Sequence, residues 1–362
     1  MDIRSIQNGN AKGLVATVVR IGLRMAAFPY AAAIGLRNRR FDQKQTEIHK
    51  VDVPVVCIGN LTVGGTGKTP IVCHLAQWLR QQNVRVAIIS RGYRSDGSGS
   101  NDEAKEMAEK LPDVPQVQNA DRFAAATTAV DELESEFLLM DDGFQHRRLN
   151  RDLDILVIDS TNPFGFGHLL PRGLLREPVS GLARAGVVLL TRCDLVSDQE
   201  LEFIHRTVSQ HCHEGVPCLR TQHATKELFQ YDRQTQPIQW LQDRKVVTVC
   251  AIGNPTAFEK TVQQCGATIL DRIQFPDHDD FGPAAIASLV EKIKGQRDQV
   301  EAIICTHKDL VKIQTDRLAG VPLMAISVEL TFRDDPGPLY DKLTALIGVV
   351  TDPERSRTDQ RE

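Results

Sequence analysis

Residues 53–70 read Val53-Pro54-Val55-Val56-Cys57-Ile58-Gly59-Asn60-Leu61-Thr62-Val63-Gly64-Gly65-Thr66-Gly67-Lys68-Thr69-Pro70. The apolar, β-branched run at the start predicts a buried strand. A glycine-rich turn follows, and residues 71–79 then carry apolar side chains at helical spacing. A strand, a glycine loop and a helix in this order are the setting of a phosphate-binding loop.

The residues of this loop suit the binding of phosphate. Glycines let backbone N–H groups turn inward around phosphate oxygens, and the start of the helix adds partial positive charge. We expect Lys68 to reach the outer phosphates and the Thr69 hydroxyl to ligate Mg²⁺. The alternative is a glycine turn that precedes Lys-Thr by chance, and the flanking strand and helix disfavour it. The predicted nucleotide-binding residues are Gly64, Gly65, Thr66, Gly67, Lys68 and Thr69.

The loop departs from the standard pattern G-x-x-x-x-G-K-[ST], because Thr62 stands at the place of the first glycine. Residues 63–69 are closer to the variant loop of partitioning-type ATPases. Those proteins carry a second lysine where this chain has Val63.

Composition limits the class of protein. A chain of 362 residues suits two domains, or one large domain with an appendage. Aliphatic runs alternate with amphipathic stretches, which predicts an α/β fold with a mainly parallel sheet. The net charge of −4 does not suggest a nucleic-acid partner. Eight cysteines without a C-x-x-C pair indicate reduced thiols, and we interpret His211-Cys212-His213 as a surface loop rather than a metal site.

The stretch Leu14–Leu36 is apolar and rich in alanine, but Arg20 and Arg24 interrupt it. The two arginines are four residues apart, so they share one helix face with Thr17. This pattern fits a helix in the membrane interface, and it fits equally an amphipathic helix packed on the globular body. Basic residues that would favour anionic headgroups on the cytoplasmic side follow: Arg37, Arg39, Arg40 and Lys44.

A second signal for nucleotide chemistry is the run Phe137–Gly143, a buried strand that ends in Asp141 and Asp142. In nucleotide-binding α/β proteins, such a carboxylate ligates Mg²⁺ directly or through water. A simple strand-end turn is the alternative, because Asp-Asp-Gly also favours turns. Together with the phosphate loop, the pair predicts a metal site made of Thr69, Asp141 and Asp142.

The sequence predicts that the whole chain divides into four regions. We expect an N-terminal helix with its basic flank at 1–45, a P-loop domain at 46–228, a second and smaller α/β lobe at 229–350, and a disordered tail at 351–362. The polar residues 221–244 are interpreted as the crossover into the second lobe.

Seen together, the motifs resemble those of the lipid A 4′-kinases, also called tetraacyldisaccharide 4′-kinases. The resemblance covers roughly residues 51–310, and the motifs occur in family order. They are the glycine loop at 59–70, Ser90-Arg91-Gly92-Tyr93, Asp121-Arg122, Asp141-Asp142-Gly143-Phe144-Gln145-His146, Leu175-Arg176-Glu177-Pro178, the loop around Asp277-His278, and Thr306-His307-Lys308-Asp309-Leu310.

The resemblance implies transfer of the ATP γ-phosphate to the 4′-hydroxyl of a tetraacylated glucosamine disaccharide 1-phosphate, giving lipid IVA. It implies ATP and Mg²⁺ as cofactors, an acylated disaccharide lipid substrate, and a place at the cytoplasmic face of the bacterial inner membrane through the N-terminal helix. Asp102 resembles the acid that activates the acceptor hydroxyl, and His278 resembles the histidine that pairs with it. Lys68 is the third residue that this resemblance places in catalysis.

Several arginines are candidates for binding ATP or the 1-phosphate of the substrate, although a solvated basic surface is the simpler interpretation of any one of them: Arg91, Arg94, Arg147, Arg148, Arg172 and Arg176.

Two other functions remain open. The first is a partitioning- or switch-type NTPase that acts as a regulatory binder. The second is a soluble kinase of a small acceptor, with a merely structural N-terminal helix. Thr191-Arg192-Cys193-Asp194 faintly resembles the guanine-reading Asn-Lys-x-Asp motif, but it lacks the leading asparagine, which disfavours GTP.

Overall fold

The structure is a computed structural model, and it describes residues 3–92, 107–276 and 279–351 of the chain. The chain divides into two compact units. Unit 1 comprises Met1–Gly92, Lys110–Gln222 and Phe332–Glu362, and unit 2 comprises Tyr93–Glu109 and His223–Thr331. The domain boundaries that we expect from the sequence stay predictions.

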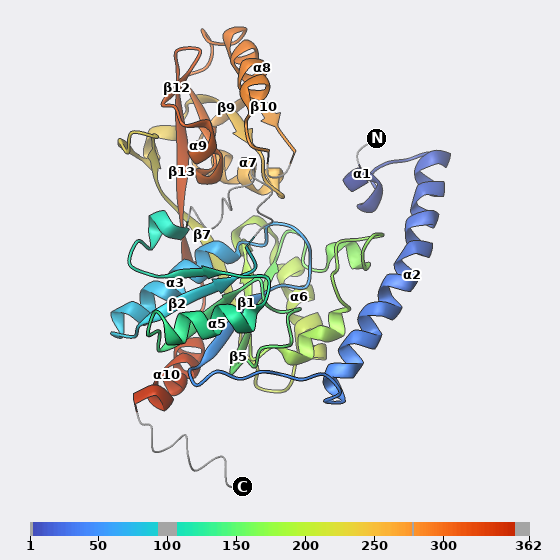
Figure 1. The fold of residues 1–362 in the computed structure, drawn as a ribbon. Helices are drawn as coiled ribbons and strands as arrows, with labels where there is room; N and C mark the ends of the chain where they lie inside the picture. Colours follow the sequence, from blue (N-terminus) through green and yellow to red (C-terminus); the bar gives the residue numbers. More distant parts are fainter. Residues whose placement is uncertain (1–2, 93–106, 277–278, 352–362) are drawn as a thin grey trace. The chain divides into compact units, whose positions relative to one another are not determined.

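Unit 1 is built on a parallel sheet with the strand order β7-β6-β5-β1-β4-β2-β3. Figure 1 labels β1, β2, β5 and β7 of this sheet. The predicted α/β class with a mainly parallel sheet is therefore confirmed. The central strand β1 lies between β4 and β5, and Ile58 of β1 is in register with Asp141 of β4. The strands are β1 (Val55–Gly59), β2 (Val86–Ser90), β3 (Gln116–Gln118), β4 (Phe137–Asp141), β5 (Leu153–Asp159), β6 (Val187–Thr191) and β7 (Cys218–Phe229).

Unit 1 also contains helices and short 3₁₀ turns. They are α1 (Ile3–Gln7), α2 (Leu14–Asp42), α3 (Lys68–Gln81), α5 (Arg122–Asp131), α6 (Asp198–His211), α10 (Gly337–Thr351), η1 (Gly165–Gly167), η2 (Val179–Arg184) and η3 (Cys193–Leu195). Ser197 and Glu200 form a capping box that fixes the start of α6. By contrast, α3 starts without a side-chain cap, after Gly67 in the left-handed conformation. The N–H groups at the start of α3 are therefore not satisfied by a capping side chain.

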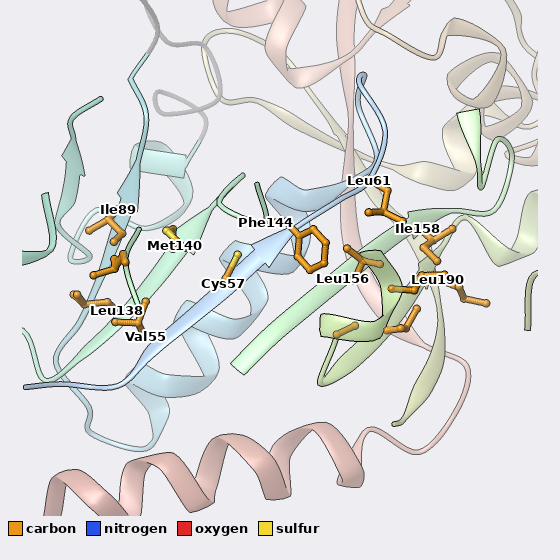
Figure 2. Packing of buried hydrophobic residues seen from close by; sticks show 14 of the residues in the cluster. Val55, Cys57, Leu61, Ile89, Leu138, Met140, Phe144, Leu156, Ile158 and Leu190 are labelled. Carbon is orange, nitrogen blue, oxygen red and sulfur yellow. The ribbon is translucent and has the colours of Figure 1, made fainter. Parts of the chain in front are cut away.

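The core of unit 1 lies around β1, β4, β5 and β6. Figure 2 shows Val55, Cys57, Leu138 and Leu156 among the buried side chains of this cluster. These strands read as continuous apolar runs because both faces of a parallel sheet are covered. Phe144 is fully buried beside the end of β1, and it leaves no room there: a Cβ on Gly59 would lie 2.5 Å from the Phe144 Cβ.

Helix α2 is six residues longer than the predicted stretch Leu14–Leu36, and it is long and apolar enough to cross a membrane. Its apolar residues at spacings of three and four form an exposed stripe. We call the stripe the apolar stripe of α2, and it consists of Leu14, Val18, Ile21, Met25 and Phe28. Ala16 and Phe41 of the same helix are buried, so α2 has one face packed on unit 1 and another face open to solvent.

The strands of unit 2 pair in the order β10-β9-β11-β13, parallel to one another, and β12 adds to β13 in an antiparallel direction. The strands are β8 (Thr235–Pro237), β9 (Lys245–Cys250), β10 (Thr268–Gln274), β11 (Ala302–Cys305), β12 (Arg317–Leu318) and β13 (Val321–Phe332), and the helices are η4 (Ile238–Leu241), α7 (Pro255–Gln264), α8 (Pro283–Lys294) and α9 (His307–Ile313).

The polar segment 221–244, which we interpret as a crossover, contains regular structure. Residues up to Phe229 continue β7, and β8 pairs with this strand, so about the first third of the segment is regular sheet. Leu219, Thr221 and Leu228 are buried positions of β7. Backbone pairing stabilises this strand. Because most of its side chains are polar, the hydrophobicity pattern does not predict it.

Candidate active site

The glycine loop between β1 and α3 has an open inner face. Gly64 and Gly67 have φ values of 109° and 81°, which side-chain-bearing residues rarely adopt. A Cβ placed on Gly64 or Gly65 would meet no atom within 4 Å. The loop therefore offers backbone and free space, as a phosphate cradle requires.

Lys68, the first residue of α3, points into a network of polar side chains. Its Nζ lies 3.1 Å from Oδ1 of Asp142 and donates a hydrogen bond of 3.2 Å to Oδ1 of Asn60. Asn60 in turn donates to the carbonyl oxygen of Thr62 at 2.7 Å. The lysine ammonium is thus held at the mouth of the loop by one carboxylate and one amide oxygen.

The two aspartates at the end of β4 differ in their surroundings. Asp141 is buried at the strand end, and Asp142 follows it with a left-handed φ of 50°. Arg176 Nη1 donates to both carboxylate oxygens of Asp142, at 3.0 and 2.9 Å. Burial would raise the pKa of Asp142, but the charges of Lys68 and Arg176 outweigh it and lower the pKa to about 2. Asp142 is therefore ionised at neutral pH.

Arg176 reaches this place because its segment pairs with the glycine loop. The N–H of Val63 donates to the carbonyl oxygen of Leu174 at 2.8 Å, and the N–H of Arg176 donates to that of Leu61 at 2.7 Å. The carboxylate, the lysine and the arginine come from three separate stretches of the chain, and backbone hydrogen bonds fix two of these stretches to each other.

A buried glutamate supports the same segment. Glu177 is 1% exposed and forms an ion pair with Arg184 at 2.8 Å. Gln145 donates to both Glu177 Oε1 and the carbonyl oxygen of Asn60, each at 2.9 Å. Its own carbonyl Oε1 accepts from Arg176 at 3.2 Å. The Gln145 side chain thus connects the end of β1 to the side chains of both Arg176 and Glu177.

A second group braces the loop from the side of β5 and β6. The Thr191 hydroxyl donates to the carbonyl oxygen of Thr66 at 2.9 Å, and Arg192 donates to that of Gly65 at 3.1 Å. Arg192 also pairs with Asp159 at the end of β5. The residues that faintly resemble a guanine-reading motif therefore contact the loop backbone.

Helix α2 contacts the Arg176 segment directly. The Tyr30 hydroxyl donates to the carbonyl oxygen of Arg176 at 2.9 Å, and Asn38 Nδ2 donates to Glu177 Oε2 at 3.2 Å. Arg37 donates to the backbone carbonyl of Gln145. The apolar N-terminal helix is thus attached to the residues around the lysine.

The predicted site residues have different outcomes. The structure brings Lys68 and Asp142 together beside the glycine loop, and Arg176 joins them. Thr69 is buried in the first turn of α3, next to Lys68 in the chain. Asp102 and His278 lie outside the described residues, as does Arg94.

Sequence reasoning did not assign roles to Asn60, Gln145 and Glu177. Gln145 and Glu177 stand inside stretches that the family resemblance quotes, which was the only signal available for them. Among the described residues, no group of three His, Cys, Asp or Glu side chains could hold a metal ion. A magnesium site at the loop would therefore need the Thr69 hydroxyl and phosphate oxygens besides the two carboxylates.

Similarity to known proteins covers most of the chain. A sequence model of the family described as tetraacyldisaccharide-1-P 4′-kinase matches residues 19–347. Tetraacyldisaccharide 4′-kinase of Geobacter sulfurreducens is 33% identical over 95% of this chain and 98% of its own length. The enzyme of the same name from Halothermothrix orenii is 32% identical over 84% of this chain and 87% of its own length.

A solved structure supports the same relationship. The "apo" form of LpxK from Aquifex aeolicus in complex with ATP matches with a TM-score of 0.70 and 29% sequence identity. The match covers 91% of this chain and 99% of that chain.

Proposed function

The chain belongs to the tetraacyldisaccharide-1-phosphate 4′-kinase family, and from this premise we propose how its residues transfer the γ-phosphate of ATP to the 4′-hydroxyl of a tetraacyldisaccharide 1-phosphate. The reaction gives lipid IVA in lipid A biosynthesis. The observation that carries the assignment of residues is the contact of Lys68 and Arg176 with Asp142 beside an open glycine loop.

In this proposal, the glycine loop and Lys68 bind the β- and γ-phosphates of ATP. The transition state of phosphoryl transfer spreads negative charge over the phosphoryl oxygens, so catalysis depends on positioning and on cations. Backbone N–H groups of residues 64–67 and the start of α3 face this charge. Asp142 and Asn60 hold the Lys68 ammonium in place before the nucleotide arrives.

The residues that would hold Mg²⁺ are Thr69, Asp141 and Asp142. Hydroxyl and carboxylate oxygens are the ligands that this cation takes in proteins, so their donor chemistry fits. When bound, Mg²⁺ supplies positive charge next to the phosphates. Because Asp142 also pairs with Lys68 and Arg176, it would serve to keep lysine, arginine and metal site in one arrangement.

The acceptor hydroxyl must lose its proton, and we assign this task to Asp102 on the family resemblance. A carboxylate within hydrogen-bonding reach accepts the proton as the new P–O bond forms. His278 would orient that carboxylate. A double-mutant cycle on kcat with Asp102→Ala and His278→Ala tests the pairing: losses that do not multiply support one unit, whereas multiplied losses contradict it.

The membrane surface is the second partner that we propose. The family's lipid substrate carries acyl chains, and the apolar stripe of α2 is exposed to solvent. A helix with this stripe and basic residues near it suits the membrane interface. We place the enzyme at the cytoplasmic face of the bacterial inner membrane, where ATP is present, and expect no nucleic-acid partner.

The direct experiment measures phosphate transfer from ATP by the purified protein to a tetraacyldisaccharide 1-phosphate in detergent. We expect Lys68→Ala to lower kcat about 100- to 1000-fold, the size seen when an electrostatic donor of the transition state is removed. Lys292→Ala, at an exposed position of α8, is the control and should keep full activity.

Two results would contradict the proposal. ATP hydrolysis that is independent of the lipid acceptor would favour a regulatory NTPase. Near wild-type turnover of Lys68→Ala at saturating ATP would show that another part of the chain binds the phosphates.

A further inference from the structure

A buried ion pair of Arg151 and Asp154 borders the apolar core of unit 1. Arg151 Nη2 lies 3.2 Å from Oδ2 of Asp154, and the two side chains are only 8% and 11% exposed. Asp154 of β5 is in register with Cys57 of the central strand β1. Cys57 belongs to the apolar cluster that Figure 2 shows. Two charges therefore lie next to side chains that are mostly apolar.

Such a pair is a poor means of stabilising a fold. Burial raises the pKa of the Asp154 carboxyl, and the charge of Arg151 acts against this shift. Removing two charges from water costs free energy that their attraction often fails to offset, and apolar residues of similar volume commonly stabilise a core as well. The buried pair therefore points to a role other than stability.

The other terminal nitrogen of Arg151 contacts the turn that follows β4. Arg151 Nη1 donates to the carbonyl oxygen of His146 at 3.0 Å. The N–H of His146 donates to the carbonyl oxygen of Gly143 at 2.7 Å, which closes residues 142–146 into a turn. We call these residues the β4 turn. Arg151 thus holds the last residue of the β4 turn, and Asp154 orients the guanidinium that makes this contact.

The β4 turn carries two side chains of the candidate active site. Asp142, its first residue, pairs with Lys68 and Arg176. Gln145 donates to the carbonyl oxygen of Asn60 at 2.9 Å. The φ of Asp142 is 50°, a conformation that residues with a side chain keep only where their surroundings fix it. The positions of both side chains therefore depend on the path of one short turn.

The backbone next to Arg151 is fixed to the central strand. The N–H of Asp152 donates to the carbonyl oxygen of Val55 at 2.8 Å, and Asp152 Oδ2 accepts from the N–H of Val55 at 2.8 Å. Val55 is the first residue of β1, and the glycine loop follows this strand in the chain. The contact of Arg151 with the β4 turn therefore fixes the turn relative to the strand that carries the loop.

From these contacts we propose that Arg151, oriented by Asp154, is a positioning residue for phosphoryl transfer. It acts through the β4 turn, which sets Asp142 and Gln145 beside Lys68. The proposal rests on the proposed function, in which these side chains surround the ATP phosphates. A displacement of such groups by about 1 Å lowers a rate about 100-fold without removing any reacting group.

The experiment replaces the whole pair with apolar residues, in the double variant Arg151→Met/Asp154→Val. Because this variant leaves no unpaired charge in the core, its Tm should stay near that of the wild type. Its kcat for transfer from ATP to tetraacyldisaccharide 1-phosphate in detergent, measured well below the Tm, should fall about 10- to 100-fold. The KM for ATP should change less than kcat, since the glycine loop and Lys68 are intact.

Three further variants separate positioning from a loss of packing. Arg151→Lys should keep more of kcat than Arg151→Met, because it returns the charge without the planar fork. Gln145→Ala should lower kcat less in the double variant than in the wild type, because both changes act through the same turn. Arg80→Gln/Asp113→Asn removes an exposed ion pair from the end of α3 and is the control that should keep kcat.

A double variant that folds and keeps the kcat of the wild type would overturn the positioning role, as would losses that multiply with Gln145→Ala. If the double variant is unfolded at the assay temperature, Arg151→Lys with Gln145→Ala completes the same cycle, and multiplied losses there would again overturn the role. A wild type that transfers no phosphate would contradict the kinase function itself, whereas an active wild type with a fully active double variant contradicts the positioning role alone.

Discussion

Asp142 is the carboxylate that pairs with both Lys68 and Arg176. It holds Lys68 on one side and Arg176 on the other, so one carboxylate keeps two cations from repelling each other. The same arrangement explains why its pKa is about 2 instead of the ordinary 3.8. An aspartate at this place is therefore a structural counter-ion as well as a candidate metal ligand.

A pH experiment can detect this role. Since the folded-state pKa of Asp142 is depressed, its ion pairs stabilise the fold above about pH 4, and the stabilisation is lost as the pH falls towards 2. We predict that Asp142→Asn has a lower Tm than the wild type at pH 7 and that the difference shrinks between pH 4 and pH 2.

The matched control is Asp113→Asn, which removes an exposed carboxylate that pairs with Arg80 at 2.9 Å. Exposed pairs contribute about 0–1 kcal/mol, so its Tm should stay close to that of the wild type at every pH. A constant Tm difference for Asp142→Asn across the whole range would contradict the depressed pKa.

Thr191 allows a test of the loop brace. Thr191→Val keeps the shape of the side chain and removes the hydroxyl that donates to Thr66. We predict that the KM for ATP rises about fivefold, the value of one hydrogen bond of about 1 kcal/mol, while the KM for the lipid acceptor is unchanged. Thr221→Val is the control, because its buried hydroxyl donates to Leu190 in β6. A rise in the KM for ATP with both variants would point to a general loss of packing.

Strand β1, the glycine loop and helix α3 together organise unit 1, and the glycines of this segment have two different roles. Gly59 stands where β1 passes Phe144, and any side chain there would overlap with Phe144. Gly65 stands only a few residues later, at a place where a Cβ would meet nothing. The first glycine serves packing, and the second leaves room for a ligand.

Two alanine substitutions separate these tasks. Gly59→Ala should destabilise the fold by about 1–3 kcal/mol, as overpacking of a core does, and lower the Tm. Gly65→Ala should leave the Tm unchanged and weaken ATP binding, because its methyl group would point into the phosphate cradle. Calorimetry and nucleotide titration measure both effects. If Gly65→Ala bound ATP as the wild type does, the open face of the loop would not be the phosphate site.

The sequence predicts elements well where local pattern and packing agree. The buried strands around Cys57 and Met140 are almost entirely apolar, and the runs that predict them match the structure closely. The long strands β7 and β13 were not predicted, since the pairing of both depends on partners far along the chain. In β7 most side chains are also polar. Of the site, the sequence showed Lys68 and Asp142, but not that Arg176 would join them.

The contact between Arg176 and Asp142 was not predicted because it depends on pairing between distant stretches of the chain. Arg176 follows Asp142 by 34 residues and reaches it through a backbone pairing of Leu174 and Arg176 with the glycine loop. No local spacing encodes such a contact. A motif comparison can mark Arg176 as noteworthy, but only the folded chain tells what it touches.

On the scale of the whole molecule, α2 distinguishes this protein from a soluble nucleotide-binding domain. Val18, Met25 and Phe28 are 60%, 68% and 70% exposed along one stripe. Isolated apolar residues on a surface are ordinary, but a continuous stripe of them indicates an interaction surface.

Replacing these three residues with serine tests the membrane assignment. We predict that the triple variant no longer floats with lipid vesicles, while its Tm and its kcat on acceptor dispersed in detergent remain near those of the wild type. The residues lie away from the face that carries Tyr30 and Asn38, so the contacts with the Arg176 segment should persist. Full vesicle binding by the triple variant would show that α2 does not mediate attachment.

The hydrogen bond from Tyr30 to Arg176 has a kinetic consequence. If α2 lies in the membrane interface, this bond fixes the height of the phosphate loop above the bilayer. The acceptor then reaches the enzyme by lateral diffusion within the leaflet, and only ATP arrives from bulk water. The reaction rate would follow the mole fraction of acceptor among the lipids, and diluting it with inert phospholipid at constant total acceptor would slow turnover.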